Sequence, residues 1–281
     1  METVVSSSSK EVIIGEGRPT VIIGERINPS GRKSLQEALK AGDMEMVRKD
    51  ATAQAEAGAD ILDVNMGVFG IDEAALLSKA VQLVMEVTDL PLCIDSSTPE
   101  ALEAALKVYK GKALVNSTTA EEASLSKVLP LVKEYDASVI GLPQDENGIP
   151  SDAAGRVALT HKIVERAEKL GITRDRIIID CLALAIGADP ESCLKAVETA
   201  TRIKNELGVN LTLAVSNLSF GMPDRHLINN AFAATIIAAG ATCLIADVSK
   251  IRPIVTAADL LMAHDKRARR YIGAYHERQN V

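Results

Sequence analysis

From about residue 20 onward, two patterns of apolar and polar positions alternate along the chain. Short runs rich in Val, Ile and Leu have the character of buried strands, and longer stretches with a 3.6-residue period separate them. The strand-like runs are residues 20–28, 59–65, 91–96, 112–118, 137–143, 177–182, 211–217 and 243–248. Helical periodicity is clear in residues 43–59 and 189–208. The pattern predicts eight strands that alternate with helices.

Residues at the borders of these stretches support the division. Thr98 followed by Pro99 predicts a helix start, because threonine suits the N-cap and proline the first helical position. Gly58, Gly171 and Gly208 predict helix ends, since glycine readily adopts the left-handed conformation that closes a helix.

Strands buried on both faces and separated by helices pair in parallel through right-handed crossovers. Eight such units in about 250 residues predict a (β/α)₈ TIM barrel, formed as a single domain by residues 20–281. A doubly wound open sheet is the alternative, but no G-x-G-x-x-G follows the first strand and no G-x-x-x-x-G-K-[ST] occurs. Residues 1–19 are Ser-rich, and we expect a flexible lead-in with a short capping hairpin as an option.

Composition and charge exclude several classes of protein. The net charge is −7, the pI is about 5.3 and no basic stripe is present, which argues against nucleic acid and anionic membranes as partners. No apolar run has the length of a membrane span, and residues 1–12 lack the apolar core of a signal peptide. The cytoplasm is therefore the expected location.

The four cysteines do not predict a metal site. Cys93, Cys181, Cys193 and Cys243 lie far apart, without a C-x-x-C pair or a nearby histidine at ligand spacing. Three of them belong to apolar strand-like runs, where a free cysteine behaves as a small hydrophobic residue.

Nearly every predicted strand ends in a polar side chain. These residues are Glu25, Asn28, Asp63, Asn65, Asp95, Asn116, Asp180, Asn217 and Asp247. In a parallel barrel all of these ends share one rim, where barrel enzymes place their chemistry. Any one Asp or Asn could instead cap a helix or a turn, and Asp63 and Asp247 suit that role equally well. The rim is expected to supply carboxylates and amides but no His, no Lys and no catalytic Ser.

Such a rim suits a neutral, planar ligand with many hydrogen-bonding edges. An ionised aspartate only accepts hydrogen bonds, whereas asparagine both donates and accepts. A pteridine ring fits, because it carries an exocyclic amine and ring N–H groups beside a carbonyl and ring nitrogens. Aromatic residues make up 2% of the chain and Trp is absent, so hydrogen bonds rather than ring stacking must orient the ligand.

Six motifs in order resemble those of the pterin-binding methyltransferases that exchange a methyl group between tetrahydrofolate and a corrinoid protein. They are GERIN at 24–28, LDVN at 62–65, CIDS at 93–96, LVNST at 114–118, IIIDCL at 177–182 and VSNLSFG at 215–221. The likeness spans about residues 20–265 and is strongest to short enzymes such as that of glycine betaine demethylation. The folate module of cobalamin-dependent methionine synthase is similar too. The resemblance implies a (β/α)₈ barrel, usually a homodimer, with the pterin in the carboxyl-end cup.

The resemblance also implies roles for single residues. Asp95, Asn116 and Asp180 would bind the pyrimidine side of the pterin, with Asn65 in the same binding set. Asn217 would approach the methyl-bearing N5 nitrogen, and Arg225 would line the open side. Glu25 and Asn28 match positions that adjoin the ligand. We assign catalysis to Asn217 and Asp95.

Methyl transfer from N5 needs protonation or strong hydrogen bonding at that nitrogen, because a tertiary amine is a poor leaving group. An amide can donate to the neutral amine or accept from the protonated one, so Asn217 suits a transition state in which charge appears on nitrogen. The amide cannot be the source of the proton, which a carboxylate or solvent must deliver.

The corrinoid is expected on a separate partner protein. DRHLIN at 224–229 begins like the D-x-H-x-x-G motif of B12-binding domains, but Asn229 stands where glycine is needed. His226 is therefore not predicted to be a cobalt ligand.

Other functions remain open. Dihydropteroate synthase shares the barrel and the ligand, but its first-loop and last-strand patterns differ from GERINPSGRK and CLIADVSK here, although Arg26, Arg32 and Lys33 could serve an anion. The sequence is also compatible with a non-catalytic folate-binding module, and with a structural barrel whose rim residues are only caps.

Overall fold

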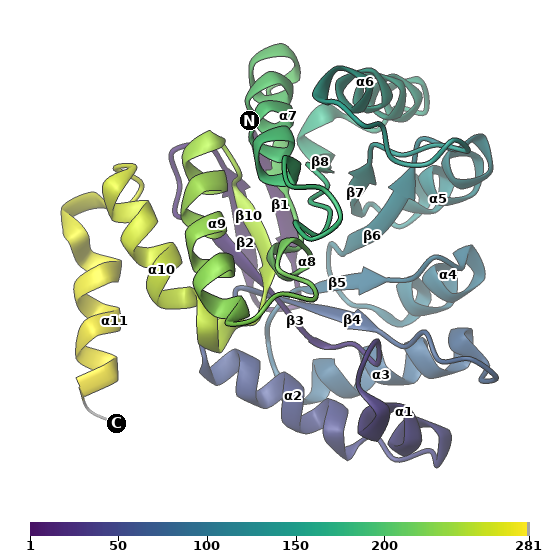
Figure 1. Ribbon diagram of the computed structural model, residues 1–281. Coiled ribbons are helices and arrows are strands. Elements are labelled where there is room, and N and C mark those ends of the chain that lie inside the picture. Colours follow the sequence, from purple (N-terminus) through teal and green to yellow (C-terminus); the bar gives the residue numbers. More distant parts are fainter. Residues whose placement is uncertain (280–281) are drawn as a thin grey trace.

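Eight parallel strands form a ring in the computed structural model, which describes residues 1–279 (Figure 1). The strands are β3 (Val21–Ile27), β4 (Ile61–Asn65), β5 (Leu92–Asp95), β6 (Leu114–Thr119), β7 (Ser138–Leu142), β8 (Ile177–Asp180), β9 (Asn210–Thr212) and β10 (Cys243–Ala246). Their order around the sheet is β10-β3-β4-β5-β6-β7-β8-β9. A parallel bridge between Ala214 and Ile245 joins the two outer strands, and the predicted (β/α)₈ barrel is confirmed.

Helices cover the outside of the ring. They are α1 (Lys33–Lys40), α2 (Glu45–Glu56), α3 (Glu73–Val87), α4 (Pro99–Val108), α5 (Glu122–Glu134), α6 (Ala153–Lys169), α7 (Ser192–Leu207), α8 (Val215–Leu218), α9 (Arg225–Ala239), α10 (Val248–Leu261) and α11 (Arg269–Gln279), with short 3₁₀ turns η1 (Arg174–Arg176) and η2 (Lys266–Ala268). The predicted borders are confirmed at α4, where Thr98 is the N-cap, and at α7, where Gly208 is left-handed with φ 64°. Among the described residues, no helix is both long and apolar enough to cross a membrane.

Two layers of apolar side chains hold the fold together. The larger layer lies between the strands and the helices. The smaller layer fills the barrel interior and contains Val21, Ile23, Ile61, Cys93, Leu114, Ile140, Ile178, Cys243 and Ile245. Cys93, Cys181 and Cys243 are buried free thiols, so they act as small apolar residues as predicted.

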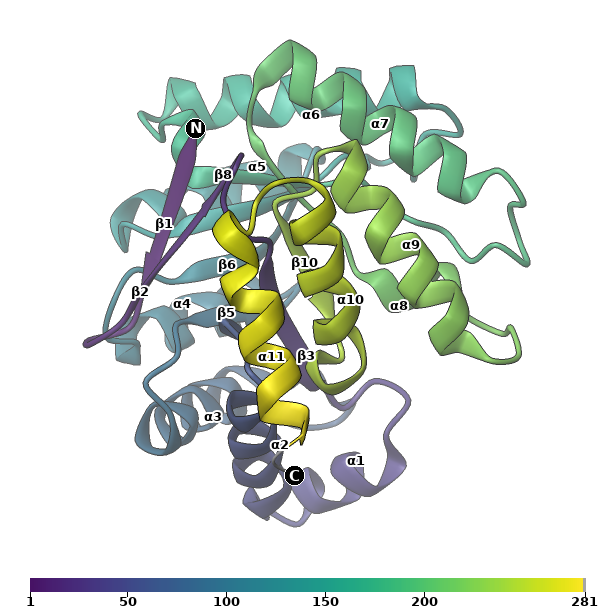
Figure 2. The same cartoon turned by 90° about the vertical axis from the view of Figure 1, so that its left-hand side faces the viewer.

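An antiparallel hairpin closes the amino end of the barrel. It consists of β1 (Glu2–Ser6) and β2 (Glu11–Gly15), and it lies opposite α8 in Figure 2. Val5 and Ile14 are fully buried against the interior layer, and the Asn210 side-chain amide donates to the Ile14 carbonyl oxygen at 3.0 Å. Residues 1–19 thus form the hairpin that the sequence offered only as an option to a flexible lead-in, because the open barrel end gives their apolar side chains a place to pack. The division of the chain at residue 20 stays a prediction.

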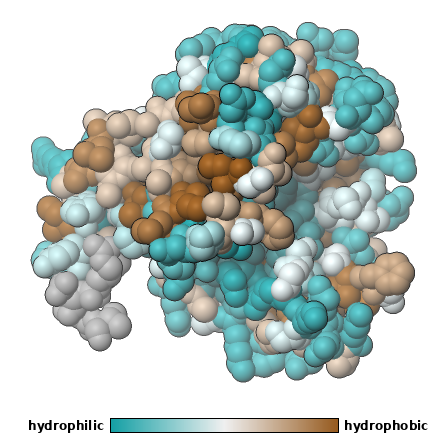
Figure 3. All heavy atoms as spheres, in the orientation of Figure 1, coloured by the Kyte–Doolittle hydropathy of each residue, from teal (hydrophilic) through white to brown (hydrophobic). Residues whose placement is uncertain are grey.

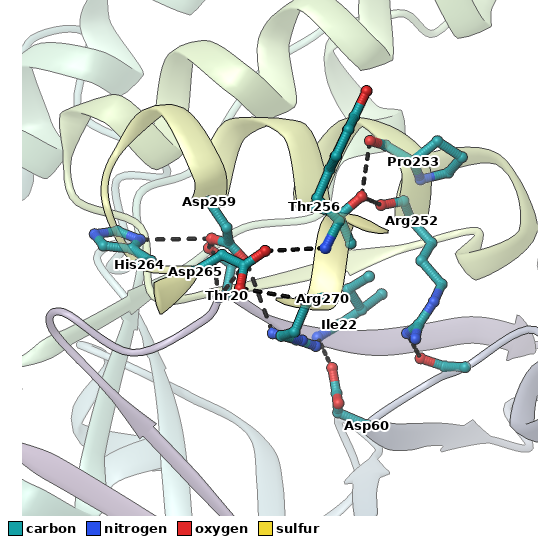
Figure 4. A network of polar contacts seen from close by, with 12 residues as sticks. Thr20, Ile22, Asp60, Arg252, Pro253, Thr256, Asp259, His264, Asp265 and Arg270 are labelled. Atoms are coloured by element: carbon teal, nitrogen blue, oxygen red, sulfur yellow. Dashed lines mark hydrogen bonds and ion pairs between the residues drawn. The ribbon is translucent and has the colours of Figure 1, made fainter. Parts of the chain in front are cut away.

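A polar network ties the C-terminal helices to the starts of two strands (Figure 4). Asp259 on α10 is 1% exposed and accepts hydrogen bonds from the Thr20 hydroxyl at 2.6 Å and from its main-chain N–H. Asp60, just before β4, accepts from the Ile22 N–H at 2.8 Å. Arg252 donates to the Gly58 carbonyl oxygen at 2.6 Å. The bonds of Asp259 and Arg252 fix α10 at the amino end, and an ion pair between Arg270 and Asp259 at 3.7 Å attaches α11, on the far side from the predicted site.

Candidate active site at the carboxyl end of the barrel

Two amide–carboxylate pairs lie in the carboxyl-terminal parts of β4 and β5 and in the middle of β6. The Asn65 amide donates to Asp95 at 3.0 Å, and the Asn116 amide donates to Asp63 at 3.1 Å. Asn65 is in register with Asp95, which is in register with Asn116. Strands β4, β5 and β6 therefore bring these four side chains into one cluster.

Burial changes the acidity of both carboxyl groups in this cluster. It raises the pKa of Asp63 well above its ordinary value, and the neighbouring Asp95 charge raises it further. Burial also raises the pKa of Asp95, to about 6, although the Asn65 and Asp63 hydrogen bonds oppose the change. The arrangement favours a protonated Asp63 and leaves Asp95 able to accept N–H groups at neutral pH.

Asp180 lies at the end of β8 and is 7% exposed. One of its oxygens accepts from the Leu182 N–H at 2.7 Å, and Leu182 has a φ of +53°. That conformation costs a leucine about 1–2 kcal/mol, so the turn depends on surrounding contacts. Burial raises the pKa of Asp180 to about 7, which places both of its protonation states within reach at neutral pH.

Asn217 does not end a strand, and that prediction is wrong. Strand β9 stops at Thr212, and Asn217 belongs to the four-residue helix α8. Just before this helix, the Leu213 carbonyl oxygen accepts the Ile245 N–H at 3.0 Å and completes the ring. A helix of one turn has no detectable periodicity, so no sequence pattern indicated it. Asn217 is solvent-exposed on this turn above the strand ends.

A cavity of about 550 Å³ opens beside the cluster. Its lining comes from β3, α8, α9 and the β10–α10 junction: Glu25, Arg26, Val215, Ser216, Asp224, Arg225, His226, Asn229, Asn230, Ala246, Asp247, Lys250 and Ile251. Glu25 accepts a hydrogen bond from the Ser216 hydroxyl at 3.1 Å, and burial raises the pKa of Glu25. Of the predicted pterin residues, Glu25 and Arg225 line this cavity, whereas Asp95, Asn116 and Asp180 do not.

Arg225 braces the loop between α8 and α9. It donates to the Ser216 carbonyl oxygen at 2.7 Å and to the Ser219 hydroxyl at 3.0 Å, and its guanidinium lies 6.0 Å from the centre of the Phe220 ring. The expectation that the rim supplies no His and no Lys is wrong, because His226 and Lys250 line the cavity, and Ser216 lines it too. These residues follow the strands instead of ending them, so the strand-end pattern could not reveal them. That no serine is catalytic stays a prediction.

Asn28 is engaged locally. Its side-chain oxygen accepts the Ser30 N–H at 2.9 Å, in the turn that leads to α1. It does not line the large cavity, and its predicted contact with the ligand stays a prediction.

The sequence reasoning missed Arg156, which is fully buried in α6. The periodicity of apolar residues in this helix could have revealed it. Arg156 falls on the apolar stripe of that helix, among the buried positions Ala153, Val157 and Thr160. An arginine on such a stripe needs specific partners.

The fold and the gathered side chains define an α/β-barrel protein whose candidate site lies at the carboxyl ends of its strands. The chain belongs to the family of pterin-binding enzymes, whose pattern matches residues 24–247. The resemblance found in the sequence motifs is confirmed.

Among its relatives is the methylcorrinoid:tetrahydrofolate methyltransferase of Eubacterium limosum, with 32% identity over 92% of this chain and 96% of the relative. Methionine synthase of Mycobacterium leprae (strain TN) is 30% identical over 90% of this chain, which spans 22% of that longer protein. Among solved structures, dihydropteroate synthase of Xanthomonas albilineans has a TM-score of 0.74 and 20% identity, covering 94% of this chain and 100% of the other. This last likeness shows the fold alone.

Proposed function

We propose that the protein exchanges a methyl group between N5 of tetrahydrofolate and the cobalt of a corrinoid carried by a separate protein. The observation that carries the proposal is the gathering of Asp95, Asn116 and Asp180 at one end of the barrel, beside the helix turn that holds Asn217. The methylcorrinoid:tetrahydrofolate methyltransferase, which matches nearly end to end, supports the choice of substrates.

The residues would divide the work between binding and chemistry. Asp95 and Asp180 accept N–H groups of the pyrimidine edge, Asn116 serves a mixed edge, and Asn65 holds Asp95 in place through its 3.0 Å hydrogen bond. Glu25 and Arg225 border the open side of the ligand, and Asn28 adjoins it.

During transfer to cobalt, the N5–methyl bond breaks and its electron pair stays on nitrogen, which takes up a proton. The amide of Asn217 stabilises the charge that changes at N5, and its exposed position leaves it free to turn as a donor or an acceptor. With a pKa of about 6, Asp95 is mainly ionised at neutral pH and takes up a proton in mildly acidic solution, and we keep its assignment to catalysis as part of the proposal.

The corrinoid partner would dock over the carboxyl end of the barrel, where the folate is bound. We also retain the homodimer as part of the proposal. It is supported by exposed apolar side chains on α10 and α11, namely Leu261, Tyr271, Ile272 and Tyr275. Figure 3 shows hydrophobic residues among polar ones on the left-hand part of the molecule. A cytoplasmic location stays a prediction.

The decisive experiment follows cob(I)alamin by absorbance when the purified protein and methyltetrahydrofolate are added. We expect the cob(I) absorbance to disappear with protein-dependent kinetics. Calorimetry with tetrahydrofolate is the companion measurement. Folate binding without methyl transfer would favour the non-catalytic folate-binding module, and no binding at all would refute the proposal.

Dihydropteroate synthase remains the alternative enzyme. Its structural likeness has only 20% identity, and the last-strand and first-loop patterns of this chain differ from those of that enzyme. Formation of dihydropteroate from a pterin pyrophosphate and 4-aminobenzoate would establish it.

A further inference from the structure

A buried arginine supports the turn that carries Asp180. Arg156, in the first turns of α6, has no exposed surface. One terminal nitrogen of its guanidinium donates to the carbonyl oxygens of Cys181 at 3.2 Å and Leu182 at 2.6 Å. Its Nε donates to the Pro150 carbonyl oxygen at 3.2 Å. The side chain therefore joins the loop before α6 to the turn after β8.

The contacted turn needs such support. Leu182 has a left-handed φ of +53°, which is unfavourable for a leucine, and this conformation lets its N–H reach the Asp180 carboxylate at 2.7 Å. The two carbonyl groups held by Arg156 belong to consecutive peptide links, the one before and the one after the Leu182 Cα. If the guanidinium were removed, the carbonyl oxygens of Cys181 and Leu182 would lose a charged donor that restrains the turn.

The same loop reaches the helix that carries Asn217. Beyond the turn, the Ile186 N–H donates to the Leu218 carbonyl oxygen at 2.9 Å. Leu218 is the residue after Asn217 and the last of α8. The loop after β8 thus connects Asp180 with the turn that holds Asn217. Arg156 donates hydrogen bonds to the first two residues of this loop.

The charge of Arg156 also acts on Asp180. Burial is the main influence and raises the pKa of Asp180, whereas the nearby guanidinium cation lowers it. Arg156 therefore increases the fraction of Asp180 that is ionised at a given pH. The ionised carboxylate is the form that accepts N–H groups.

We propose that Arg156 is a positioning residue for the pterin, holding the 180–182 turn so that Asp180 is presented to the ligand in its ionised form. This inference rests on the proposed function, because it assigns Asp180 to folate binding. Arg156 itself would not touch the substrate.

The test compares Arg156→Met with Arg176→Met. Arg176 is a matched control, since its guanidinium also donates to two main-chain carbonyl oxygens, those of Val132 and Ala137, but before β8 at the amino end of the barrel. The dissociation constant of tetrahydrofolate is measured by calorimetry from pH 6 to 9, alongside the melting temperature of each variant. Arg156→Lys, which keeps the charge, is the conservative variant.

We expect Arg156→Met to weaken folate binding about ten- to hundredfold at pH 7, with the pH at which binding reaches half its maximum moved upward. Arg156→Lys should restore part of the affinity and keep the wild-type pH dependence. Arg176→Met should lower the melting temperature. It should leave the dissociation constant of tetrahydrofolate and its pH dependence unchanged.

Wild-type affinity and pH dependence in folded Arg156→Met would overturn the inference, as would equal effects of the two methionine variants on binding. If Arg156→Met does not fold, Arg156→Lys and Arg176→Lys decide, and only the former should weaken binding. A wild-type protein that binds no folate would instead refute the proposed function.

Discussion

The Ser216 hydroxyl donates to the Glu25 carboxylate at 3.1 Å, across a sequence separation of 191 residues. This bond joins α8 to β3, while the hydrogen bond from Ile186 to Leu218 holds the other end of α8. The short helix is therefore attached on both sides of Asn217. An asparagine on so short a helix can hold a defined position only because its neighbours in sequence are fixed.

Replacing this asparagine should impair transfer more than binding. We expect Asn217→Ala to lose about 2–4 kcal/mol of transition-state stabilisation, because one oriented hydrogen-bonding group is removed. The rate of cob(I)alamin methylation at saturating methyltetrahydrofolate measures the loss. Asn205→Ala, at an exposed position of α7, is the control and should keep the wild-type rate. An unchanged rate in folded Asn217→Ala would remove the residue from catalysis.

Folate affinity should depend on pH through Asp180. Its pKa is about 7 in the free protein, and pterin N–H groups bind the ionised form. Protonation therefore competes with binding, and affinity should fall as the pH drops below about 7. Calorimetry between about pH 5.5 and 8.5, a range that brackets this pKa, checks this for the wild type.

Asp180→Asn provides the comparison. It should bind folate more weakly at pH 8, because the carboxylate acceptor is lost. Its affinity should also depend less on pH, because the asparagine amide does not titrate in this range. Identical pH curves for the two proteins would assign the titration to another group.

Truncating the hairpin core should destabilise the whole barrel. Ile14→Ala is expected to lower the free energy of unfolding by about 2–5 kcal/mol, since Ile14 is fully buried against the interior layer. Urea denaturation provides the measurement. Ser8→Ala, in the exposed turn of the hairpin, should change stability by less than about 0.5 kcal/mol. Equal stability of Ile14→Ala and the wild type would mean that residues 1–15 act only as a lead-in.

The buried Asp259 should contribute more to the free energy of unfolding than an ion pair on the surface does. Asp259→Ala leaves the Thr20 N–H and hydroxyl without their acceptor, at a cost of about 1–3 kcal/mol or more. Asp136→Ala removes an exposed partner of Arg176 and should cost about 0–1 kcal/mol. Both values come from chemical denaturation, and a larger loss for Asp136→Ala would contradict the assignment.

Large exposed apolar side chains surround the carboxyl end of the barrel, in the connections that follow β4, β8 and β9 and in the first turns of α7 and α9. They are Phe69, Leu194, Phe220 and Leu227. Phe69 is 97% exposed, which serves no purpose in the isolated fold. We expect Phe69→Ser with Leu227→Ser to slow methyl exchange with a corrinoid protein and to leave exchange with free cobalamin unchanged. Equal slowing with both acceptors would show that the substitutions disturb the folate site.

The sequence was sufficient for the barrel because the strands are largely buried on both faces and the long helices between them have their own periodicity. It also placed Asp95 and Asp180 correctly at strand ends, since parallel strands bring their carboxyl ends to one rim. Asn116 does not end its strand, because β6 continues to Thr119. Asn217 was misplaced because Leu213 and Ala214 continue the apolar run after the strand has ended. Where a strand ends depends on which residues can pair with the neighbouring strand in the closed barrel. A local stretch of sequence does not contain that information.

Long-range polar contacts were beyond prediction for a different reason. Glu25 and Ser216, or Thr20 and Asp259, meet only after the barrel has closed. Neither member of such a pair differs from an ordinary surface residue in its local pattern. Arg156 was the exception, because a charge on an apolar stripe is itself a sign of a buried partner.

The β1–β2 hairpin at the amino end bears on the order in which folate and the corrinoid protein bind. In the described part of the chain, the β1–β2 hairpin and the apolar side chains of the barrel interior pack together at the amino end. Under the proposed function, folate enters by the same carboxyl-end face on which the corrinoid protein docks, so a docked partner would block exchange of the small substrate. Steady-state kinetics should follow a compulsory sequence in which folate binds first and leaves last, and excess corrinoid protein should inhibit by trapping the empty enzyme.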